Sequence, residues 1–189
     1  YGRVIPSDDI QAEVDAIMPK VVALTKKQLL GPLGIEFSGH YKRLVDVPFN
    51  ALNFSFFAPE LGEIPAYITG SHTFFGGEQD GIPLLRSIFE YNPAYHMTFL
   101  SLIALCMHEF VPGHDLNAVT ADLLYRDGKF GFESTMHTMA SPQTALWEGL
   151  AQNALTLLFG DRETAYQHLG ALFHVEPIDF AISYAVDDM

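Results

Sequence analysis

Cysteine is almost absent from the sequence: the 189 residues include only one, Cys106. A single thiol excludes an intrachain disulfide and a zinc site built from cysteines. Because Cys106 stands inside an apolar run, we expect a buried core thiol rather than a nucleophile.

Positive charge is also scarce. Ten lysines and arginines stand against 23 aspartates and glutamates, which gives a formal net charge of −13. A chain with this charge repels phosphate backbones and anionic membrane surfaces, so we expect no nucleic-acid partner. The longest apolar run, Met97–Met107, has 11 residues, whereas a membrane-spanning helix needs about 20. We therefore expect no membrane insertion.

No signal peptide is recognisable at the N-terminus, so the cytoplasm is the default expectation for location. The chain opens on Tyr1 rather than on methionine, which indicates a fragment of a longer protein whose upstream signal could have been removed. Hydrophobic residues make up 49% of the chain and charged residues 17%. This composition is typical of a folded domain, and at this length we expect one domain spanning residues 1–189.

Apolar periodicity predicts a mainly α fold with a small β element (α+β). Ile10–Leu30 carries a helical stripe, which Pro19 should kink or divide. The stretch Gly31–Gly81 is rich in glycine, proline and aromatic residues and holds short β-like runs at Ala51–Phe57 and Ala66–Thr69. From Pro83 onward the expected helices are Pro83–Glu90, Ala94–Val111, Asp115–Arg126, Pro142–Phe159 and Asp161–Phe173.

The segment that carries chemistry runs from His108 to His114 and reads His-Glu-Phe-Val-Pro-Gly-His. A catalytic zinc ion needs three protein donors and an open fourth position for water. On an unbroken helix a spacing of six residues leaves the second imidazole about 120° off the face of the first and roughly 9 Å further along the axis. Pro112 and Gly113 permit a broken turn. We therefore expect the helix to be interrupted between Val111 and His114.

The pattern His-Glu-x-x-Pro-Gly-His resembles the motif of a bacterial zinc-peptidase-like family of the glutamate-zincin type. Members usually carry a further histidine directly after this motif and a second motif, Glu-Gly-Trp-Ala, later in the chain. Here Glu148-Gly149-Leu150-Ala151 begins 34 residues after His114. The chain departs from the family pattern at Asp115, which replaces the further histidine, and at Leu150, which replaces the tryptophan.

The resemblance implies a zincin-like metallopeptidase catalytic domain, belonging to a longer helical protein, that holds one Zn²⁺ ion through His108, His114 and Glu148. It also implies a catalytic carboxylate at Glu109. The chemistry of the residues assigns the same role to Glu109, because a carboxylate next to a ligand could act as general base toward the attacking water. The expected substrate is a peptide or small amide, and the oligomeric state is open.

Supporting residues are less sharply defined by the sequence. Gln152 lies one helical turn after Glu148 and could hydrogen-bond a ligating imidazole. An oxyanion stabiliser is also needed. The candidates for it are His137, Tyr166 and Tyr184.

Blander interpretations stay open at the level of sequence. Pro112 and Gly113 could merely end one helix while His114 begins the next, and Glu148 could be a surface acid near a helix N-terminus opened by Ser141 and Pro142. The alternatives to a peptidase are a non-peptidase zinc amidohydrolase and a non-catalytic zinc-containing binding or structural module.

Overall fold

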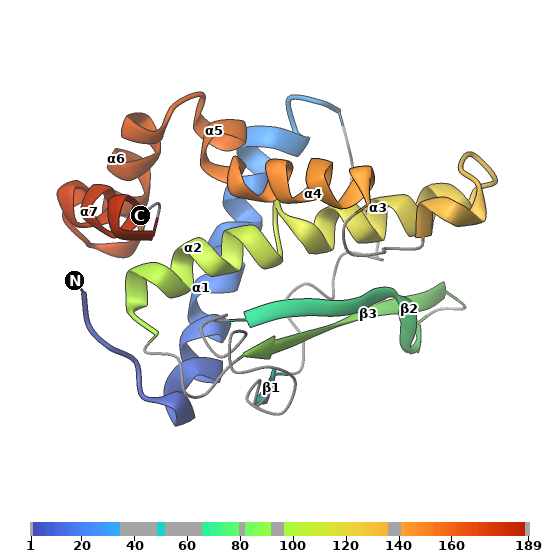
Figure 1. The fold of residues 1–189 in the computed structure, drawn as a ribbon, viewed down its shortest axis with the longest axis horizontal. Helices are drawn as coiled ribbons and strands as arrows, with labels where there is room; N and C mark the ends of the chain where they lie inside the picture. The colour runs from blue at the N-terminus through green and yellow to red at the C-terminus, as the bar shows by residue number, and fades with distance from the viewer. Residues whose placement is uncertain are drawn as a thin grey trace.

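The computed structural model of the chain describes residues 2–34, 49–51, 66–79, 82–91, 97–135 and 141–187. Over these residues the protein is mainly helical and carries one small sheet, as the sequence predicts (Figure 1). The helices α2 and α3 follow one another through the middle of the molecule, and α4 contacts both of them. None of the helices in these ranges is long and apolar enough to cross a membrane.

The first long helix, α1 (Ile10–Thr25), follows a short 3₁₀ turn at Ser7–Asp9 and continues into a π-helical turn, η2 (Lys26–Leu30). Its apolar stripe is buried in the core. Pro19 lies inside α1 without dividing it. Proline removes the hydrogen bond to the carbonyl four residues earlier, but Asp15 and Pro19 are both exposed, so water can satisfy that carbonyl.

The centre of the core is α2 (Phe99–Glu109), which begins at Thr98, whose Oγ1 accepts a hydrogen bond from the Ser101 amide at 3.1 Å. Five of its apolar side chains are buried: Leu100, Leu102, Ile103, Cys106 and Met107. Burial, reinforced by the charge of Glu109, raises the pKa of the Cys106 thiol far above its ordinary range. A thiol that stays protonated is a poor nucleophile, and the expectation of a buried core cysteine is confirmed.

The sheet has the strand order β1-β3-β2. β2 (Ala66–Gln79) pairs antiparallel with β3 (Ile82–Tyr91), and the short β1 (Phe49–Ala51) pairs parallel with β3. The predicted strand Ala66–Thr69 is confirmed as the start of β2. Of the predicted strand Ala51–Phe57 only Ala51 falls within the described residues.

The predicted helix Pro83–Glu90 is wrong, because this segment forms β3. Its apolar run is short enough to suit a helix or a strand, so periodicity alone does not decide between them. Pairing with β2 decides it: Ile88 lies opposite Thr69, and Glu90 lies opposite Tyr67. The pairing residues of β2 lie outside the short stretch of sequence in which helical periodicity is judged. The apolar periodicity of residues 83–90 alone therefore gives the wrong prediction.

The C-terminal part is a series of helices: α4 (Pro142–Gln152), α5 (Ala154–Phe159), α6 (Arg162–Phe173) and α7 (Pro177–Asp187). The prediction of one helix over Pro142–Phe159 is wrong in its continuity, since the chain breaks at Asn153. The predicted helix Asp161–Phe173 is confirmed, with Asp161 as its N-cap. α7 lies beyond the last helix expected from the sequence.

Candidate metal centre

The turn between α2 and α3 is the feature that brings the two histidines together. α2 ends at Glu109, and Phe110 leaves helical geometry with φ −101° and ψ −91°. α3 (His114–Arg126) then begins at His114 itself. The predicted interruption between Val111 and His114 is confirmed, so one helix ends and the next begins here, as the blander interpretation also required.

Gly113 allows the chain to fold back closely on the end of α2. A Cβ atom built on this residue would collide with the backbone carbonyl of His108. Residues 110–113 are all buried, and the Val111–Pro112 peptide bond is cis. Only a residue without a side chain fits this approach, and the approach places the first residue of α3 beside the last turn of α2.

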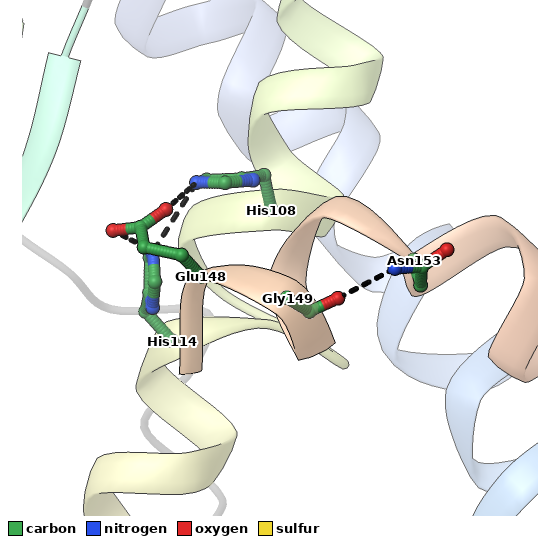
Figure 2. Close-up of polar contacts among 5 residues, drawn as sticks. All are labelled: His108, His114, Glu148, Gly149 and Asn153. Atoms are coloured by element: carbon green, nitrogen blue, oxygen red, sulfur yellow. Dashed lines mark hydrogen bonds and ion pairs between the residues drawn. The ribbon is translucent and has the colours of Figure 1, made fainter. Parts of the chain in front are cut away.

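Three side chains converge at this junction, as Figure 2 shows. The Nε2 atoms of His108 and His114 lie 3.2 Å apart, and their rings are nearly perpendicular at 88°. Glu148 reaches them from α4, with one carboxylate oxygen 3.6 Å from Nε2 of His108 and the other 3.3 Å from Nε2 of His114. The three residues form a group whose ligand atoms all lie within 4.8 Å of one another, so the group could hold a metal ion.

The spacing of these atoms matches the coordination shell of a small metal ion. Ligand bonds of 2.0–2.1 Å in a tetrahedral shell place neighbouring donor atoms about 3.3–3.4 Å apart. The two nitrogens lie 3.2 Å apart, one carboxylate oxygen lies 3.6 Å from the nitrogen of His108, and the other lies 3.3 Å from that of His114. Each imidazole nitrogen thus lies at about the tetrahedral spacing from the other nitrogen and from one of the two carboxylate oxygens of Glu148.

Burial keeps both imidazoles in the form that binds a metal. Desolvation, followed by the neighbouring charge of His114, lowers the pKa of His108 to about 4, although Glu148 acts in the opposite direction. Desolvation also lowers the pKa of His114 against the same opposing carboxylate. A metal takes the lone pair of a neutral imidazole, and both rings offer it at neutral pH.

The group is open on one side. The side chains of His108 and His114 are 21% and 18% exposed, whereas that of Glu148 is 52% exposed.

Glu148 lies more than one helical turn inside α4, beyond the first turn where the helix N-terminus favours negative charge. Its position is therefore accounted for by the imidazoles that it faces and not by the helix N-terminus.

Glu109 is buried at the end of α2, directly after His108. It does not belong to the group of converging ligand atoms. A carboxylate beside the site but outside the ligand set is compatible with a general base, and this role stays a prediction.

The structure describes the side chains of only two of the four supporting residues that the sequence predicts. Gln152 is exposed at the end of α4 and, within the described part of the chain, makes no hydrogen bond to either imidazole. The ring of Tyr166 stacks on Phe180 of α7, with the ring centroids 6.4 Å apart. His137 and the side chain of Tyr184 lie outside the described residues. Of the three oxyanion candidates, only Tyr166 has a side chain within the described part of the chain, so this role stays a prediction.

Sequence reasoning gave no role to Asn117, which lies three residues after His114 on α3. Its side-chain nitrogen is buried and has no hydrogen-bond partner among the residues that the structure describes. Residues three apart on a helix are neighbours on its surface. The only feature of the sequence that could have drawn attention to Asn117 is its place about one helical turn after His114, a predicted ligand.

Comparison of the chain with protein-family models, with curated proteins and with solved structures finds no significant match.

Proposed function

We propose that this protein binds one zinc ion through His108, His114 and Glu148 and hydrolyses peptide or related amide bonds. The observation that supports the proposal most is the convergence of two imidazole nitrogens and one carboxylate, whose ligand atoms all lie within 4.8 Å of one another. Two histidines and one glutamate, with a fourth position left to water, form a known ligand set of catalytic zinc.

The donor set favours zinc over the hard divalent cations. Magnesium and calcium prefer shells made of oxygen, whereas imidazole nitrogens suit zinc and other transition metals. Three protein ligands leave one tetrahedral corner empty, and a purely structural zinc site usually closes all four corners with protein atoms. The side chain of Glu148 is 52% exposed, so a substrate could approach the metal from this side.

The reaction divides between the ion and the protein. Bound zinc would act as a Lewis acid and lower the pKa of a coordinated water. Glu109 accepts a proton from the attacking water while the water oxygen forms a bond to the carbonyl carbon. Glu109 then returns this proton to the leaving nitrogen as the carbon–nitrogen bond breaks. His108 and His114 remain neutral throughout and hold their positions.

The proposal is tested by measuring metal content together with hydrolysis. The protein is loaded with zinc, dialysed and assayed against a mixed peptide library before and after treatment with a chelator. We expect one zinc per chain, and cleavage that stops on chelation and returns with zinc. Cleavage of small amides without any peptide cleavage would favour the amidohydrolase. Stoichiometric zinc without any hydrolysis would instead favour the non-catalytic module.

A further inference from the structure

The junction between α4 and α5 is formed by one exposed residue, Asn153. It ends α4 and begins α5, with φ −96° and ψ 17°, far from the helical values of about −63° and −42°. Both its backbone amide and its side-chain amide donate to the carbonyl of Gly149, at 3.2 and 2.8 Å. Its own carbonyl accepts from the Leu157 amide at 2.9 Å and so starts α5. Figure 2 shows the side-chain bond beside the metal ligands.

The direction of α4 depends on this junction because α4 is poorly anchored by burial. Ala151 is the only buried residue of α4, whereas α5 buries Ala154, Leu155 and Leu158 although it is much shorter. Among the described residues, burial in the core thus anchors α5 more firmly than α4, which contacts α2, α3 and α5. Glu148 is carried by the less anchored helix.

The residues around Asn153 favour an uninterrupted helix, as the predicted helix Pro142–Phe159 indicates. Asparagine is the exception within that window. Its side chain competes for nearby backbone groups and so favours helix ends over helix interiors. The bond from its side chain to the Gly149 carbonyl is such a local competitor.

We propose that Asn153 is the positioning residue that sets the direction of α4 and thereby places Glu148 against His108 and His114. This inference rests on the proposed metal site. Glu148 lies five residues before Asn153, about 7.5 Å along the helix axis. A change of axis of roughly 20° at the junction would move it by about 2.5 Å. Metal–ligand bonds tolerate only about 0.2 Å, so a straightened junction removes Glu148 from the ligand set.

The test compares Asn153→Ala with Asn153→Ser and with Thr156→Ala, which replaces an exposed polar residue of α5 by alanine as a matched control. Zinc affinity is measured by competition with a chelating dye, and folding by thermal unfolding and circular dichroism. Alanine removes the amide donor and favours a continuous helix. We expect Asn153→Ala to keep or raise the helix content and to lose about tenfold or more in zinc affinity. Serine keeps a hydroxyl donor, and both it and the control should stay within about threefold of the parent.

Trp147, the only tryptophan of the chain, precedes Glu148 and reports the orientation of α4 without a label. In metal-free protein, Asn153→Ala should change the emission and acrylamide quenching of Trp147, whereas Thr156→Ala should not. Parental zinc affinity in a folded Asn153→Ala variant would overturn the positioning role. If the parent itself binds no zinc, the metal site fails, and unchanged Trp147 emission in the metal-free variant would then separately overturn the role of Asn153.

Discussion

The Nε2 atoms of His108 and His114 lie 3.2 Å apart although the two residues stand six positions apart in the chain. An unbroken helix would direct the two rings about 120° apart. The buried turn at residues 110–113 removes that separation by ending α2 and starting α3 at the second histidine. The turn between α2 and α3 therefore brings two of the three proposed ligands together.

Replacing a ligand and replacing the base should give different losses. We expect His108→Ala to lose zinc and all metal-dependent hydrolysis, because one of the three donors is removed. Glu109→Gln should keep zinc and lose hydrolysis by at least 10²-fold to 10⁴-fold, about the usual contribution of general acid–base catalysis. Glu163→Gln makes the same charge change at an exposed position of α6 and serves as the control. Parental turnover by Glu109→Gln, on a substrate whose cleavage a chelator stops, would remove Glu109 from the mechanism.

Gly113→Ala should damage both the fold and the metal centre. The new Cβ would collide with the His108 carbonyl, which is backbone and cannot swing aside. Relieving the collision separates the start of α3 from α2, and overpacking of this kind costs about 1–3 kcal/mol. Gly149→Ala is the contrasting change: its Cβ meets nothing within 4 Å, and alanine favours a helix interior over glycine by about 0.5–1 kcal/mol. Urea unfolding of both variants measures the difference, and equal stabilities would show that the close approach is not required.

The stability of the metal-free protein should fall as the pH is lowered from about 6.5 toward 4. Burial lowers the pKa of both imidazoles in the folded state, that of His108 to about 4, whereas the unfolded chain takes up these protons below about 6.5. The unfolded state then binds more protons, so acid favours unfolding, and the stability is fully present above the unfolded pKa.

Chemical unfolding at about pH 7.5 and about pH 5 measures this contribution. A variant with His108→Gln and His114→Gln should show a flatter dependence, since amides do not titrate. The same slope in both proteins would mean that other groups carry the acid sensitivity.

Zinc should raise the melting temperature of the protein in proportion to the logarithm of its free concentration, because an ion that binds only the folded state stabilises it by mass action. At a free zinc concentration of 100 times the dissociation constant, the free energy of unfolding rises by about 2.7 kcal/mol. Differential scanning fluorimetry with and without a chelator measures the shift. Glu148→Ala should reduce it, and magnesium in place of zinc should produce little of it. A shift of equal size in Glu148→Ala would place the ion elsewhere.

The candidate site could be predicted from the sequence further than the fold could. The turn at Pro112 and Gly113 can be predicted because the residues that form it are themselves the sequence signal. The strand Ile82–Tyr91 depends on a partner strand, so its short apolar run reads equally well as a helix. The break at Asn153 coincides with a side-chain hydrogen bond to the Gly149 carbonyl, which the apolar periodicity of the sequence does not indicate.

Glu148 and the two histidines belong to separate stretches of chain, since Glu148 stands 34 positions after His114. An ion held by all three would close that stretch into a loop, as a covalent cross-link does. For a disulfide, closing a loop of this length removes unfolded-state entropy worth about 3–4 kcal/mol. A chain with a single cysteine has no intrachain disulfide to provide this constraint. The metal would take that role by holding α4 against the α2–α3 junction.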